Sequence, residues 1–205
     1  MELKKISGEG NIAVDSKELE AMENGQYKVF PVLRDGSWVG LKHNMFFHPI
    51  IGTAENPKVV QALAYDAPEN LIYVQNSENQ NEVRDLYFEA MENLENIDKQ
   101  YTVFDFNGHF EVNASGHEFS SEFILDDKFL MKLHEVLKSD EILVAIPRRT
   151  YFKAIASTTS RDLQNGFIEE YESTFEFDSD RPQIANGVFI VKDGVIKQRG
   201  LLEKQ

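Results

Sequence analysis

The chain has 205 residues, of which 35 are acidic and 21 basic, so its formal net charge is −14. A surface with this charge repels phosphate backbones, which argues against nucleic-acid binding. Cysteine is absent, which excludes disulfides, thiolate metal sites and cysteine nucleophiles. Because no segment has the apolar length of a signal peptide or a membrane span, the sequence predicts a cytoplasmic protein that does not bind membranes.

The first predicted element is a strand over residues 26–33, which are rich in β-branched and aromatic side chains. Pro31 lies inside this run, and a proline in a strand indicates an edge position or a bulge. A turn at 34–37 then leads to a predicted return strand over 37–43.

Residues 57–65 are predicted to form a short helix, with Asn56 as its N-cap and Pro57 at its first position. Residues 71–75 are predicted to form a buried strand.

The strongest helical pattern covers residues 79–97, where apolar side chains recur every three or four positions and carboxylates fill the opposite face. Ser77 and Gln80 are spaced as a capping box at its start.

Three strand-like segments follow, at 101–106, 109–114 and 119–125. Asn107-Gly108 separates the first two, and this dipeptide is a strong signal for a two-residue hairpin turn.

The last part of the chain is predicted to alternate helices and strands. A helix runs from Asp126 or Asp127 to about residue 138, strands cover 142–146 and 151–156, a helix covers about 160–176, and a hairpin turns at 192–194. Thr159 with Asp162 resembles the capping box of the last helix.

This order of hairpins and interspersed helices predicts an α+β fold, with a largely antiparallel sheet and helices packed on one face. We expect a single domain over 1–205. The sequence leaves open an N-terminal subdomain at 1–75 beside a C-terminal core at 76–205.

Three stretches of the chain resemble the C-terminal part of the YtpQ-like family, a bacterial family whose domain has no assigned function. They are DEILVAIPRR, TYFKAIASTTSRDLQNGFIEEY and ANGVFIVKDGVI, and the resemblance covers about 122–199. Arg149 matches an arginine of the family pattern, but Thr150 stands where the pattern has an acidic residue. The resemblance therefore implies a related fold, and it implies neither an Arg–Asp pair nor an activity.

Two adjacent arginines, Arg148 and Arg149, follow Pro147 at the end of a predicted strand. Proline cannot donate to a sheet ladder, so strand pairing should stop there. In the structural interpretation, an arginine lies on the sheet edge and pairs with a carboxylate from an acidic helix. In the functional interpretation, the pair binds an anion or a carboxylate ligand.

A hydroxyl cluster near the start of the last helix is the other candidate for ligand binding. Backbone N–H groups at such a helix end, together with nearby arginines, can hold a phosphate. The candidate ligand-binding residues are Arg148, Arg149, Ser157, Thr159 and Ser160. No cofactor motif occurs, and the histidines do not have the spacing of a metal site.

Two classes of function follow from these patterns. The first is a non-catalytic binding or accessory protein that engages another protein or a peptide. The sequence is also compatible with a homodimer. The element order over 79–176 is similar to that of small acidic secretion chaperones, which bind peptide segments. The alternative is a hydrolase or phosphate-ligand protein that uses Arg148, Arg149 and the hydroxyl cluster at 157–160. The sequence leans away from an enzyme without excluding one.

Overall fold

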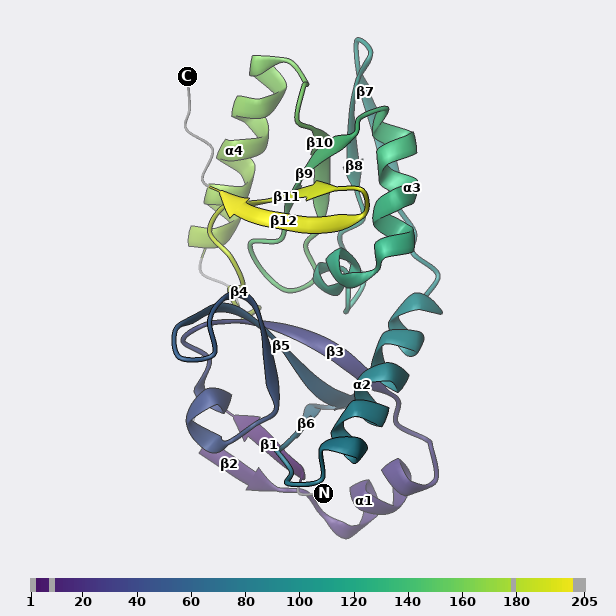
Figure 1. Ribbon diagram of the computed structural model, residues 1–205, viewed down its shortest axis with the longest axis vertical. Helices are drawn as coiled ribbons and strands as arrows, with labels where there is room; N and C mark the ends of the chain where they lie inside the picture. Colours follow the sequence, from purple (N-terminus) through teal and green to yellow (C-terminus); the bar gives the residue numbers. More distant parts are fainter. Residues whose placement is uncertain (1–2, 8–9, 178–179, 201–205) are drawn as a thin grey trace. The chain divides into compact units, whose positions relative to one another are not determined.

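A computed structural model describes residues 3–7, 10–177 and 180–200 (Figure 1). The chain divides into two compact units, Met1–Ile97 and Asp98–Gln205, and each unit contains its own antiparallel sheet. The sequence-based proposal of one domain with a subdomain at 1–75 stays a prediction.

The sheet of the first unit has the strand order β2-β1-β6-β5-β3, and β4 pairs with β5 beside this path. Its strands are β1 (Leu3–Ser7), β2 (Gly10–Ala13), β3 (Val29–Asp35), β4 (Phe47–Gly52), β5 (Pro57–Asp66) and β6 (Leu71–Val74). The predicted strands at 26–33 and 71–75 are confirmed, and Pro31 lies on the edge strand β3 as predicted.

Two of the elements predicted in this unit are wrong. Residues 57–65 form β5 instead of a helix, because this segment pairs with β3 along one side and with β4 and β6 along the other. A strand buried on both faces has a continuous apolar run without alternation, which sequence periodicity cannot separate from a buried helix. The predicted return strand at 37–43 is instead the 3-10 helix η1 (Val39–His43), where the indole of Trp38 covers Gly40.

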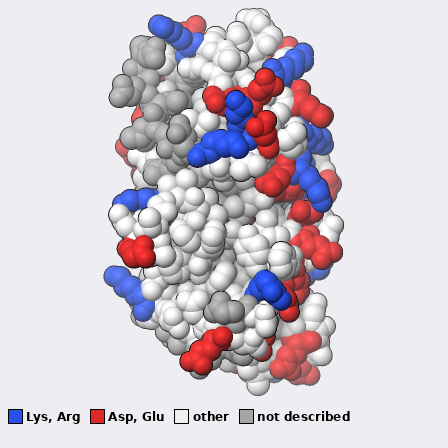
Figure 2. Space-filling model, viewed as in Figure 1, with Lys and Arg blue, Asp and Glu red and all other residues white. Residues whose placement is uncertain are grey.

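The helices of the first unit are α1 (Ser16–Glu23) and α2 (Gln80–Glu95). Both pack on the same face of the sheet, since Tyr65 contacts the apolar cluster under each helix. The predicted helix at 79–97 is confirmed, but Asn79 takes the N-cap position in place of the capping box expected at Ser77. The carboxylates of α2 face solvent, as predicted, and Figure 2 shows acidic side chains along the edge of the molecule where α2 lies.

The sheet of the second unit has the order β12-β11-β9-β10-β8-β7. Its strands are β7 (Thr102–Phe106), β8 (His109–Asn113), β9 (Glu141–Ala145), β10 (Lys153–Ala156), β11 (Val188–Lys192) and β12 (Val195–Gly200). Its helices are α3 (Asp127–Leu137) and α4 (Arg161–Glu176). The predicted hairpin turn at Asn107-Gly108 is confirmed, and both residues have positive φ as a type I′ turn requires.

The predicted strand at 119–125 is wrong, because residues Ser121–Leu125 form the 3-10 helix η2. Residues 121 to 124 are all buried, which a half-exposed strand would not allow. The compact turn brings the ring of Phe123 to 5.6 Å from that of Phe129 and 6.5 Å from that of Phe152, measured between centroids.

The predicted α+β class with antiparallel pairing is confirmed, but in the second unit helices cover both faces of the sheet instead of one. Side chains of a strand alternate between faces. Ile155 of β10 packs under α4, whereas Phe152, three residues earlier, contacts Phe129 of α3. Figure 1 shows α3 and α4 on opposite sides of this sheet. Among the described residues, no helix combines the length and the apolarity needed to cross a membrane.

A buried ion pair fixes the start of the second unit to α3. The ammonium of Lys99 lies 2.7 Å from the carboxylate of Asp126, and both side chains are almost fully buried. Asp126 is also the N-cap of α3, where it accepts from the N–H of Phe129 at 3.0 Å. The ammonium of Lys99 thus compensates a carboxylate that the helix needs but that burial disfavours.

We predict that Lys99→Met lowers the free energy of unfolding by about 3 kcal/mol or more, because it leaves the Asp126 carboxylate buried without its cation. Denaturant unfolding followed by circular dichroism measures the loss. The matched control is Lys192→Met, whose lysine is exposed and which we expect to change stability by less than about 0.5 kcal/mol. Equal effects of the two substitutions would contradict the assignment of Lys99.

Candidate functional site

The α4 side of the second sheet is only partly covered. The apolar residues of α4 pack on β9, β10 and β11. A helix is about 10 Å wide and neighbouring strands are about 4.8 Å apart, so one helix covers two or three strands of a six-stranded sheet. The hairpin formed by β7 and β8 lies beyond α4, and its α4 side is therefore left open.

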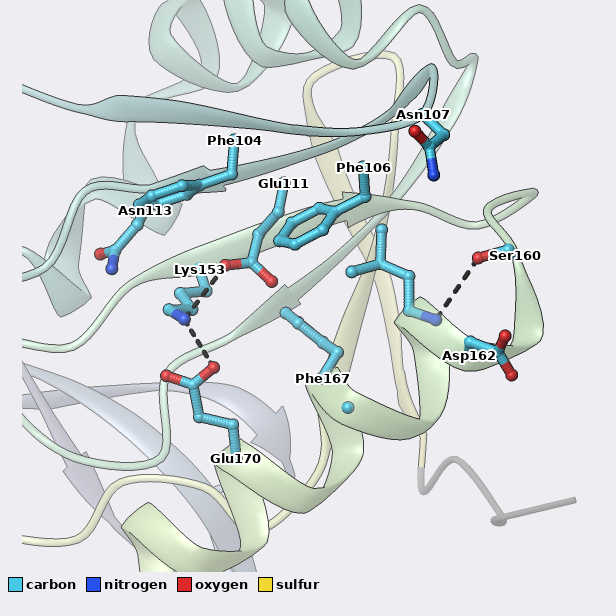
Figure 3. Close-up of a pocket in the computed structure, with 12 residues that line it drawn as sticks. Phe104, Phe106, Asn107, Glu111, Asn113, Lys153, Ser160, Asp162, Phe167 and Glu170 are labelled. Atoms are coloured by element: carbon cyan, nitrogen blue, oxygen red, sulfur yellow. Dashed lines mark hydrogen bonds and ion pairs between the residues drawn. The ribbon is translucent and has the colours of Figure 1, made fainter.

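This arrangement forms a groove of about 640 Å³ between the β7–β8 hairpin and α4 (Figure 3). From here on, "the groove" means the cavity lined by Phe104, Phe106, Asn107, Glu111, Asn113, Lys153, Ser160, Asp162, Leu163, Gly166, Phe167 and Glu170. Phe104 and Phe106 point into it from β7, and they keep 42% and 47% of their surface exposed. By contrast, Phe167 of α4 is buried at the base.

A cation held between two carboxylates lies at one end of the groove. The ammonium of Lys153 on β10 is 3.0 Å from the carboxylate of Glu111 on β8 and 2.5 Å from that of Glu170 on α4. Lys153 and Glu111 are buried, whereas Glu170 is half exposed. Burial alone would lower the pKa of Lys153, but the hydrogen bonds to Glu170 and Glu111 outweigh it and raise the pKa above its usual value.

The groove carries a net negative charge. Its lining includes three carboxylates, Glu111, Asp162 and Glu170, and a single ammonium, that of Lys153. The hydroxyl of Ser160 at the rim is the N-cap of α4 and accepts from the N–H of Leu163. Two carboxylate charges therefore remain after Lys153 is counted, next to two exposed aromatic rings.

Gly166 lies in the interior of α4, where glycine costs about 1 kcal/mol relative to alanine. A Cβ atom at this position would meet nothing within 4 Å. Packing within the chain therefore does not require glycine here, and its absence of a side chain keeps the groove open.

The paired arginines lie elsewhere, at the C-terminal end of α4. Strand β9 ends at Ala145, before Pro147, as the sequence predicted. The guanidinium of Arg148 donates to the carbonyl oxygens of Thr174, Phe175 and Arg181 at 2.7 Å each, and also to that of Phe177. The last carbonyls of a helix have no partner within it, so Arg148 acts as the C-terminal cap of α4. The predicted pairing with a carboxylate is therefore wrong for Arg148, because its partners among the described residues are backbone carbonyls.

For Arg149 the predicted carboxylate contact is confirmed. Its guanidinium lies 2.7 Å from the carboxylate of Glu118 and over the ring of Phe119, although Glu118 lies in a turn and not in a helix. Thr150, which follows, has φ of 66°, an unusual value for a β-branched residue, and its hydroxyl accepts from Arg181. Arg148, Arg149, Thr150 and Arg181 are among the residues that line a second cavity of about 330 Å³.

The structure places Arg148 and Arg149 together in the second cavity, but it keeps them apart from the predicted hydroxyl cluster. Ser160 is at the N-terminal end of α4, whereas Arg148 contacts its C-terminal end. Sixteen helical residues separate these ends by about 24 Å. Ser157 donates its N–H to the carbonyl of Glu141, and the hydroxyl of Thr159 is buried without a hydrogen-bond partner in the described part of the chain. The capping box expected at Thr159 is wrong, because Ser160 is the N-cap.

Within the described residues, no group of three or more His, Asp or Glu side chains is placed to hold a metal ion. Comparison of the chain with protein-family models, curated proteins and solved structures finds no match. The resemblance of 122–199 to the YtpQ-like family therefore stays a prediction, and the site must be interpreted from its own chemistry.

Sequence reasoning missed the groove, although two signals for it were present. Lys153 is a charge inside the apolar run YFKAIA, and a charge buried in a strand requires a partner. Phe104 and Phe106 share one face of a strand that also carries apolar Val103 on the other face. No sequence signal showed that α4 would stop short of this hairpin.

We predict that Lys153→Met lowers the free energy of unfolding by about 3 kcal/mol, because it leaves Glu111 buried without a cation. The double variant Lys153→Met/Glu111→Leu should recover most of the loss, since an apolar pair of similar volume can replace a buried ion pair. Urea unfolding measures both variants. A double variant as unstable as the single one would show that the ion pair is not what stabilises this position.

We predict that Arg148→Lys lowers the free energy of unfolding by about 2 kcal/mol, since an ammonium cannot reproduce the planar donor fork that serves these carbonyls. Arg149→Lys is the matched comparison and should cost at most about 1 kcal/mol, because the Glu118 carboxylate is half exposed. Thermal unfolding of the two variants side by side is the measurement. A larger loss for Arg149→Lys would overturn the capping role of Arg148.

Proposed function

We propose that this chain is a non-catalytic protein-binding protein, and that the groove holds a segment of a partner protein that carries apolar and basic side chains. The observation that carries this proposal is the pair of half-exposed rings, Phe104 and Phe106, above a groove with surplus carboxylates.

The two aromatic rings indicate that the ligand binds through an apolar side chain. Large aromatic side chains supply most of the binding energy where they become covered, and a cluster of them in a concave site is typical of an interaction surface. Phe104 and Phe106 lie side by side on one face of β7, and Gly166 of α4, which also lines the groove, leaves room for a side chain.

The carboxylates support a basic partner. Asp162 and Glu170 lie on α4, across the groove from the rings, and Lys153 compensates only part of the negative charge. A lysine or arginine of a partner would complement the remainder. A second copy of this chain fits less well, because each copy carries a net charge of −14 and two acidic proteins repel one another.

The alternative of a phosphate ligand or hydrolytic site formed by Arg148, Arg149 and the cluster at 157–160 is not adopted. Those residues lie at opposite ends of α4, and Arg148 is engaged with backbone carbonyls. Asp162, in the first turn of α4, also places a negative charge where a phosphate would have to bind.

Selection of a random peptide library on the immobilised full chain tests the proposal. We expect the selected peptides to be enriched in Lys or Arg together with aromatic or branched apolar residues. Phe106→Ser should weaken their binding by about tenfold or more, as expected for loss of an aromatic anchor. The matched control is Phe88→Ser, whose exposed phenylalanine lies in the first unit and which should leave the affinity unchanged.

Gly166→Leu separates binding from stability. Leucine is a better helix former than glycine, and space exists for the start of its side chain, so the variant should unfold at the same temperature or higher. Because the side chain enters the groove, the same variant should bind the selected peptides at least about tenfold more weakly. Peptides that bind Phe106→Ser and Gly166→Leu as tightly as the wild-type chain would exclude the groove as the binding site.

A further inference from the structure

Strand β7 ends the sheet of the second unit on one side, and its outer edge is open. It pairs with β8 alone among the described strands, and all five of its residues are exposed. Every second residue of an edge strand directs its backbone N–H and C=O away from the sheet, where they can pair with another chain.

The hairpin geometry shows which residues of β7 direct their backbone N–H and C=O groups outward. Asn107 and Gly108 form a two-residue turn, so Phe106 and His109 are the pair that exchanges backbone hydrogen bonds next to it. Hydrogen-bonded and non-hydrogen-bonded pairs alternate along the ladder. Val103 and Asp105 therefore direct their N–H and C=O groups outward.

This edge lacks most features that protect edge strands from pairing. Native edges are blocked by lysine, proline, bulges or a covering element. The sequence of β7 is TVFDF, without lysine or proline, and its register with β8 is continuous over all five pairs. Its one charge, Asp105, accepts from the N–H of Gly108 inside the turn.

We propose that the partner segment binds as an additional strand on the outer edge of β7, through main-chain hydrogen bonds to Val103 and Asp105. An added strand lies about 4.8 Å from β7, and its alternate side chains point to the α4 side of the sheet. There they cover Phe104 and Phe106, while backbone pairing supplies affinity that does not depend on sequence. This inference rests on the proposed function and adds the way in which the segment is held.

A proline at position 103 tests the backbone contact. The N–H of Val103 points away from β8, so Val103→Pro removes no hydrogen bond of the hairpin and keeps both rings of the groove. We expect the variant to retain its fold by circular dichroism and to bind the selected peptides about tenfold more weakly or worse. The matched control, Val103→Thr, retains the N–H and should bind within about twofold of the wild-type chain.

An N-methyl scan of the selected peptide that binds most tightly is a second test of strand addition. It does not depend on the folding of any protein variant. Strand addition predicts that methylation weakens binding at every second peptide position, because alternate amides face β7. Hydrogen exchange at the amides of Val103 and Asp105 should slow when the peptide binds to the wild-type chain.

The outcomes separate the two claims. If Phe106→Ser abolishes binding while the N-methyl scan shows no period of two and the exchange at Val103 and Asp105 is unchanged, the strand addition is wrong and the proposed function stands. A partner bound as a helix would give that result. If no peptide depends on Phe106, the proposed function fails as well. Dimerisation of the chain through β7, detected by sedimentation and lost in Val103→Pro, would also contradict a peptide as the occupant.

Discussion

A single helix is narrower than the sheet that it packs against, so α4 leaves part of the second unit's sheet uncovered. In the second unit, α4 packs on β9, β10 and β11 and ends its coverage there, while the sheet continues through β8 to β7. The aromatic side chains that β7 directs to this side, Phe104 and Phe106, therefore remain half exposed. A globular chain normally covers adjacent aromatic rings, because burial of apolar surface contributes about 25 cal/mol per Å². These uncovered rings are the surface that the proposed partner segment would cover.

The α4 wall of the groove is held in place by polar contacts at both ends of the helix and between them. At one end of α4, Ser160 caps the helix, and the side-chain amide of Gln164 donates to the carbonyls of Ser157 and Thr159. At the other end, Arg148 holds the terminal carbonyls. Between them, Lys153 joins α4 to the sheet through Glu170. A wall that is already fixed before binding loses less conformational entropy when a ligand binds.

The sequence predicted the elements with local signals and failed where tertiary context decides. The hairpin at Asn107-Gly108 and the helix α3 with its cap at Asp126 follow from turn and capping chemistry, which acts over a few residues. The sequence of strand β5 predicts a helix, because burial on both faces removes the alternation that identifies strands. The charge of the two arginines and their position after a strand end predict either a carboxylate pair or a ligand site. Arg148 instead binds four backbone carbonyls, which no pattern of side chains can indicate. The groove was missed because the width that α4 covers depends on three-dimensional packing.

The central claim is that Phe104 and Phe106 are accessible in the free protein and that α4 does not cover them. Aromatic NMR signals of the full chain, recorded with and without a soluble paramagnetic probe, test this claim directly. We expect strong relaxation enhancement at Phe104 and Phe106 and little at Phe167, which is 2% exposed beneath α4. Enhancements at Phe104 and Phe106 as small as that at Phe167 would show that the chain itself covers the two rings, and they would contradict the account.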